Sequence, residues 1–191
     1  MILLSTKADG RLPCTIPSAI SRSNRRKARS GDVSGAEKEV EKLAALRDSL
    51  VQAKNKYWAD QVEVQHRAAA ALVARAQGKN QEALNLLRSA ADLEGSMDKH
   101  PVTPAPVVPT RELLGELLLE LNQPKEALQE FEGTLVAEPN RFRSLFGAAQ
   151  AAELSRDTGK ARALYAKLVS LCDRADTQRP ELQQAKAFLR K

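Results

Sequence analysis

Three glutamates recur every four residues in the middle of the chain, at Glu112, Glu116 and Glu120. On an α-helix this spacing places their side chains one turn apart on a single face. A row of carboxylates attracts basic residues of a partner, although it can also be a merely solvated acidic face. Elsewhere the sequence contains no nucleophile–base set and no glycine-rich phosphate loop. We therefore expect a binding surface, with no catalytic residues.

The cysteines and histidines are too scattered to predict a metal or redox site. Cys14 and Cys172 lie far apart, and neither has a second cysteine or histidine nearby at the spacing of metal ligands. His66 and His100 likewise have no neighbouring ligand. We expect no metal, no cofactor and no enzymatic activity.

The glutamate row lies on the first of two amphipathic segments. Leucines at three- and four-residue spacing over 113–121 predict one apolar helical stripe, and Pro124 ends that helix and starts the next. Gly115 and Ala127 are small at positions where two antiparallel helices must come close, and Phe131 is expected to fill the space beside them. The segment therefore predicts a helical hairpin.

This hairpin resembles the 34-residue tetratricopeptide repeat in the residues Leu114-Gly115-x-x-Leu118, Ala127-x-x-x-Phe131 and Pro139. The resemblance implies an all-α fold, a right-handed α-α superhelix of stacked helix hairpins, most like bacterial tetratricopeptide proteins. The C-terminal part of a longer multi-repeat protein is one interpretation of the chain. We expect full repeats at 57–94, 110–139 and 140–172, and a capping helix at 177–191.

The first repeat is expected to be incomplete. Gly31 followed by Ala36 looks like the turn and second helix of a repeat, and Ala36 corresponds to Ala83, Ala127 and Ala161 further along. The first helix of that repeat would fall on residues 18–30, which we expect to be too polar to pack. The sequence therefore predicts a half repeat at 31–53, within an array that spans 31–191.

The net charge of +6 is concentrated near the start of the chain. Residues 1–30 hold seven bases and one acid, whereas the other 161 residues hold 23 of each. We expect 1–30 to be a basic, mostly disordered segment, and we do not expect the remainder to bind nucleic acid. No apolar run approaches the ~20 residues that cross a bilayer, and the start lacks the features of a secretion signal. A cytoplasmic location is the default expectation.

The resemblance implies a non-catalytic scaffold that binds a protein or peptide on its concave face, which the first helix of each pair lines. The alternative is a structural module that forms a homo-oligomer through the exposed half repeat. A proline-rich stretch at 95–109 is either a spacer or a ligand-contacting loop. Carried over to this sequence, the ligand-binding residues are Gln65, Leu72, Arg75, Glu112, Glu116, Leu119, Arg143, Phe146, Gln150 and Glu153.

Overall fold

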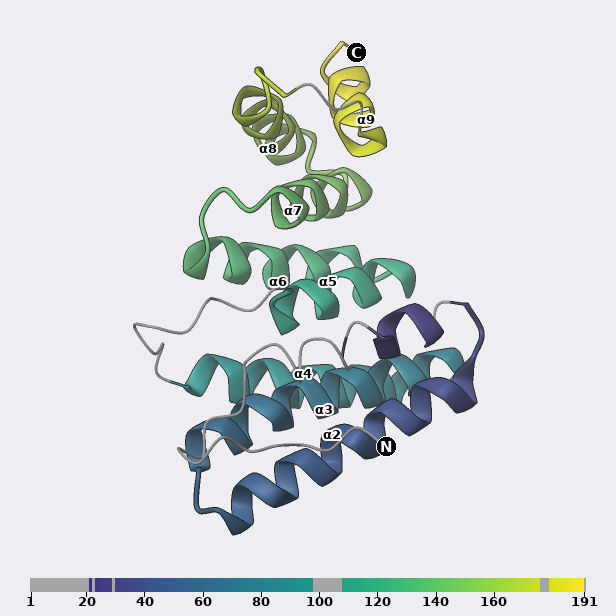
Figure 1. Cartoon of the computed structure of the whole chain (residues 1–191). Coiled ribbons are helices and arrows are strands. Elements are labelled where there is room, and N and C mark those ends of the chain that lie inside the picture. The colour runs from purple at the N-terminus through teal and green to yellow at the C-terminus, as the bar shows by residue number, and fades with distance from the viewer. Residues whose placement is uncertain (1–20, 22, 29, 98–107, 176–178, 191) are drawn as a thin grey trace. The chain divides into compact units, whose positions relative to one another are not determined.

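The computed structural model shows a chain built from α-helices (Figure 1). It describes residues 21, 23–28, 30–97, 108–175 and 179–190, and no β-strand occurs among them. The predictions for residues 1–20 and for most of the 95–109 stretch lie outside this part of the chain. The described residues form two compact units, unit 1 up to Thr110 and unit 2 from Arg111. None of the described helices is both long and apolar enough to span a bilayer.

Unit 1 consists of α2 (Val33–Gln52), α3 (Lys56–Ala76) and α4 (Asn80–Ser96), preceded by helical residues at 23–28. Leucines spaced three and four residues apart on α2 face the small and branched residues of α3, and Trp58 packs against the same cluster. The buried members of this cluster are Leu43, Leu46, Leu50, Ala59, Val62 and Ala69.

Unit 2 contains α5 (Thr110–Glu120) from its second residue onward, α6 (Pro124–Ala137), α7 (Phe142–Leu154), α8 (Thr158–Leu171) and α9 (Pro180–Leu189). Tyr165 on α8 is fully buried, and its ring lies 5.0 Å from that of Phe188 on α9. Helix α9 therefore covers apolar surface of α8. Leu145, Ala149, Leu168 and Ala185 complete this core.

Five turns between consecutive helices share one geometry. In each, one residue has a positive φ and the next N–H bonds to the carbonyl five residues earlier, which is the Schellman termination of a helix. The positive-φ residues are Gly31, Lys54, Gly78, Asn122 and Arg156. The bonds run from Asp32 to Lys27, Asn55 to Leu50, Lys79 to Ala74, Gln123 to Leu118 and Asp157 to Ala152, at 2.8–3.0 Å.

A buried alanine follows each of these turns at the same distance. It lies four residues after the residue that caps the next helix, and it is at most 5% exposed. Because the chain reverses tightly, the first turn of the new helix approaches the helix just completed, so only a small side chain fits there. These alanines are Ala36, Ala59, Ala83, Ala127 and Ala161.

The predicted half repeat is wrong for the residues that the structure describes, because helical residues 23–28 pack against α2. Asn24 is fully buried, and its Nδ2 donates to the carbonyl of Ala36 at 2.8 Å. Lys27 Nζ lies 2.7 Å from the buried carboxylate of Glu39. The polar side chains pack because α2 supplies their partners, so the helix at 23–28 and α2 form a pair.

Candidate functional site

A groove of about 180 Å³ opens on unit 2, and we call it the unit 2 groove. Aromatic and aliphatic side chains line it, and charged or amide groups stand among them. Such a mixture provides apolar contact area and orienting polar groups for a ligand. Four helices contribute: α5 with Glu116 and Leu119, α6 with Phe131, α7 with Phe142, Arg143, Phe146, Gly147 and Gln150, and α9 with Glu181.

Two glycines place the ring of Phe131 in this groove. A Cβ atom built on Gly115 would lie 2.8 Å from Phe131 Cζ, and one built on Gly147 only 2.4 Å away. Neither distance leaves room for a side chain. The Phe131 ring therefore fits only because both neighbouring positions, Gly115 and Gly147, are glycine. The contact of Phe131 with Gly115 was expected from the sequence, whereas Gly147 was missed. A glycine inside a helix lowers stability by about 1 kcal/mol relative to alanine. The presence of Gly147 within a helical segment was therefore the signal that this position requires a small residue.

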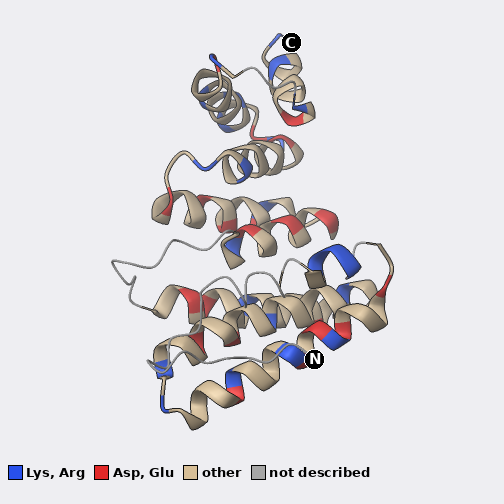
Figure 2. Cartoon of the chain, in the orientation of Figure 1, with Lys and Arg blue, Asp and Glu red and all other residues tan. Residues whose placement is uncertain are grey.

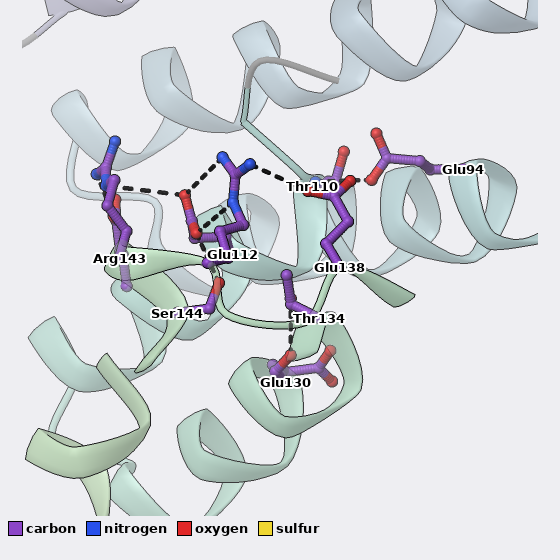
Figure 3. Close-up of polar contacts among 10 residues, drawn as sticks. Glu94, Thr110, Glu112, Glu130, Thr134, Glu138, Arg143 and Ser144 are labelled. Carbon is purple, nitrogen blue, oxygen red and sulfur yellow. Dashed lines mark hydrogen bonds and ion pairs between the residues drawn. The ribbon is translucent and has the colours of Figure 1, made fainter. Parts of the chain in front are cut away.

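Glu112 is not on a ligand-accessible surface, which corrects the prediction from the acidic row. Its side chain is fully buried, and it accepts a hydrogen bond from Ser144 Oγ at 2.6 Å (Figure 3). Arg141 Nε lies 2.9 Å from the same carboxylate, and Arg143 Nε lies 3.7 Å from it. A buried carboxylate needs such partners, and here α7 and the residue just before it provide them.

Arg141 is the main cation of this buried network. Burial opposes its charge, but its hydrogen bond and charge interaction with Glu112 outweigh burial, so the pKa of Arg141 lies above its usual value. Glu138 adds a second ion pair at 3.0 Å. The network therefore joins α5, the end of α6 and the start of α7 through hydrogen bonds and ion pairs.

Glu116, one turn after Glu112, lies at the groove and pairs with Arg143. The side chain of Arg143 is 43% exposed, so this pair meets solvent at the rim. With Glu112 buried and Glu116 paired, the glutamate row is largely neutralised. It is not the open acidic surface that the sequence suggested.

The aromatic wall of the groove continues toward α9. Arg179, just before α9, places its guanidinium carbon 4.9 Å from the centre of the Phe142 ring, a cation–π contact. Phe146 lies 6.1 Å from the ring of Tyr165 beneath it. Glu181 also lines the groove, and its carboxylate forms no ion pair with any described residue.

Five of the predicted ligand-binding residues come together in the unit 2 groove: Glu116, Leu119, Arg143, Phe146 and Gln150. Phe131, Phe142, Gly147 and Glu181 were missed. The sequence alone does not show that side chains of α6 and α9 reach the groove, and Phe142 and Gly147 lie on α7 beside the predicted Arg143 and Phe146 but were not selected.

The remaining predicted residues lie elsewhere. Glu153 does not line the groove and instead accepts a hydrogen bond from Tyr165 Oη at 3.0 Å. Burial, followed by this bond, raises the pKa of Tyr165. Gln65, Leu72 and Arg75 belong to α3 in unit 1, where Arg75 donates to Asn80 Oδ1 at 3.1 Å.

The described residues contain no cluster of histidine, cysteine or acidic side chains that could hold a metal ion. His66 on α3 is partly buried, with its Nδ1 3.5 Å from Glu63 Oε2. Burial lowers the pKa of His66, and the nearby Glu63 only partly offsets this effect. A histidine so placed is mostly neutral near neutral pH and belongs to the packing of unit 1.

Helix pairs joined by matching turns, each followed by a buried alanine, define a helical repeat fold of the tetratricopeptide type. Solved structures agree. A singly substituted variant of the kinesin light chain TPR-like repeats from Podosopora anserina is 20% identical, with a TM-score of 0.61, over 91% of this chain and 84% of that chain. The corresponding structure without that substitution has a TM-score of 0.60, with the same identity and coverage. The prediction of an all-α, tetratricopeptide-like solenoid is confirmed. No protein-family model and no curated protein matches the sequence.

Proposed function

We propose that the chain is a protein- or peptide-binding scaffold, and that the unit 2 groove receives an apolar side chain of the partner. The observation that carries this proposal is the convergence of Leu119, Phe142 and Phe146 on one groove of about 180 Å³. This volume suits a single large side chain, so the groove would hold an anchor residue and leave the rest of the partner on the surface. Pockets that bury one aromatic or aliphatic anchor supply much of the affinity in protein interfaces.

The apolar contact, and not the acidic row, supplies the binding in this proposal. Glu112 is buried and Glu116 is already paired with Arg143. A basic partner residue would therefore have to displace an existing ion pair at Glu116, whereas Glu181, which also lines the groove, forms no ion pair with a described residue. Gln65, Leu72 and Arg75 remain proposed contacts of unit 1 on its own.

Self-association through an exposed half repeat loses its basis. That alternative required the face of α2 to be uncovered, and residues 23–28 cover part of it through Asn24 and Lys27. We therefore do not carry it forward as a second function.

Selection of peptides from a random displayed library against the full chain tests the proposal. Binding of the selected peptides is then compared by fluorescence anisotropy for Leu119→Asp and for Leu154→Asp, because Leu154 is an exposed leucine of the same unit outside the groove. We expect Leu119→Asp to weaken binding by about tenfold or more, as for an interface anchor, and Leu154→Asp to have little effect. Equal effects of the two variants, or failure to select any peptide, would contradict the proposed site.

A further inference from the structure

The C-terminal end of the chain carries a surplus of positive charge that the balance of the whole sequence conceals. Residues 156–191 hold nine bases and four acids, whereas residues 31–155 hold 14 bases and 19 acids. The two surpluses cancel, so the chain after residue 30 is neutral overall. Figure 2 shows Lys and Arg distributed over α8 and α9, with few acidic residues between them.

Three of these cations come together around the end of α9. Lys186 and Arg190 are four residues apart, so they lie one turn apart on the same side. Arg162 of α8 donates from Nη1 to the carbonyl of Leu189 at 3.2 Å, which brings its guanidinium to the same end. We call Arg162, Lys186 and Arg190 the basic surface.

The basic surface is not neutralised within the part of the chain that the structure describes. None of its three side chains forms an ion pair with a described carboxylate. Basic residues in the last turn of a helix are stabilised by the helix dipole, which accounts for Lys186. It does not account for the concentration of three cations from two helices, because like charges held together repel unless an anion joins them.

The basic surface is connected to the unit 2 groove through α9. Arg179 precedes this helix and contacts the ring of Phe142, which lines the groove. Lys186 and Arg190 follow on the same helix. A polypeptide that leaves the groove beside Phe142 and follows α9 would pass Glu181 in the first turn of the helix and then reach Lys186 and Arg190.

We propose that the basic surface binds an acidic segment of the protein partner, next to the residue anchored in the unit 2 groove. The guanidinium groups of Arg162 and Arg190 suit carboxylates, to which arginine can donate paired hydrogen bonds. The continuity with an apolar groove favours a polypeptide over a nucleic acid. The position of the acidic segment next to the anchored residue rests on the proposed function, whereas the preference of the basic surface for an acidic ligand does not.

The charge preference is tested with the full chain and a fluorescein-labelled oligoglutamate, by anisotropy over a series of salt concentrations. The variant Lys186→Gln/Arg190→Gln is compared with Lys38→Gln/Arg88→Gln, which removes two exposed cations from unit 1 and leaves the same net charge. We expect the first variant to weaken binding about fivefold at low salt, as the loss of two exposed ion pairs implies, and the difference to fade at high salt. The control should bind like the wild type. Equal weakening in both variants, or in neither, would overturn the proposal.

Two further measurements distinguish the kind of anion and separate this inference from the proposed function. Duplex DNA and phosphatidylserine vesicles are titrated against the same variants. Tighter binding of either than of oligoglutamate, lost in Lys186→Gln/Arg190→Gln, would reassign the basic surface and overturn the acidic protein partner. The weakening of oligoglutamate binding in Lys186→Gln/Arg190→Gln is read without reference to the groove, whereas the effect of Leu119→Asp is read only on the peptides selected against the full chain. Failure of one result therefore leaves the other interpretable.

Discussion

Arg141 Nε lies 2.9 Å from a carboxylate oxygen of Glu112, and that carboxylate is completely buried. The pair is 29 residues apart in the chain, and it joins α5 to the start of α7 inside unit 2. Ser144 donates to the same carboxylate, so removal of the negative charge leaves a buried hydroxyl without its acceptor and leaves the partly exposed Arg141 with Glu138 alone. This network therefore fixes how one hairpin packs on the next.

Reversal of charge at Glu112 should unfold unit 2 readily. We expect Glu112→Lys to lower the free energy of unfolding by about 3–5 kcal/mol, the usual cost of breaking a buried ion pair. Glu116→Lys should cost about 1 kcal/mol or less, because its pair with Arg143 is exposed to solvent. Urea titrations followed by circular dichroism measure both. Similar small losses at the two positions would show that Glu112 is accessible, as the sequence alone suggested.

Two glycine-to-alanine changes should alter the free energy of unfolding in opposite directions. Gly147→Ala places a methyl group against the Phe131 ring, which Gly115 confines from another helix, so we expect a net loss of about 1 kcal/mol or more. Gly133→Ala, on α6, meets only Arg111 Cδ at 3.5 Å, an ordinary contact, and should gain up to about 1 kcal/mol in helix propensity. The urea unfolding midpoints of the two variants, compared with that of the wild type, measure both changes. Stabilisation by both changes would contradict the close packing of Phe131.

The helix at 23–28 should contribute to the stability of unit 1. Asn24→Ala removes a buried hydrogen bond to the carbonyl of Ala36, and we expect a loss of about 1–2 kcal/mol. Ser34→Ala, an exposed position on α2, is the matched control and should change the free energy of unfolding by less than about 0.5 kcal/mol. Both are measured by urea unfolding with tryptophan fluorescence. If Asn24→Ala is as harmless as the control, residues 23–28 do not pack and the half repeat stands.

His66 should make unit 1 less stable in mild acid. Burial holds its pKa in the folded chain below the ordinary value, so the unfolded chain takes up the proton first as the pH falls. The contribution of neutral His66 is therefore complete above about pH 6.5, the usual pKa of an unfolded histidine, and is lost as the pH falls below it. We expect His66→Gln to lose less stability than the wild type between about pH 7 and pH 5. An identical pH dependence of the urea midpoints would contradict this assignment.

The fold could be predicted from residues that act locally. Gly78 and Asn122 favour left-handed turns, and Ala83 and Ala127 mark where two helices must come close, so each hairpin is encoded within about 34 residues. The turn at Arg156 was less obvious, because a residue that is not glycine adopts a positive φ there. Its geometry follows from the packing of α7 on α8 more than from the propensity of one residue.

The candidate site was harder to predict because its properties depend on distant partners. Glu112 has the spacing of an exposed row, and only Arg141 and Ser144, placed by the next hairpin, make it a buried acceptor. Polar residues 23–28 were likewise misread, since the partner of Lys27 is a glutamate on α2. Helical periodicity identifies the apolar face of a helix, but it does not show where a charged group finds a buried counterion.

The single tryptophan of the sequence, Trp58, lies in unit 1, packed against the buried cluster between α2 and α3. Its emission therefore reports that unit alone, while far-ultraviolet circular dichroism records the helices of both. Because repeat arrays can unfold in parts, the two optical signals need not follow the same melting curve. A mutation in unit 2 that shifts both transitions would indicate cooperative unfolding of the two units, and one that shifts only the dichroism transition would indicate that they unfold separately.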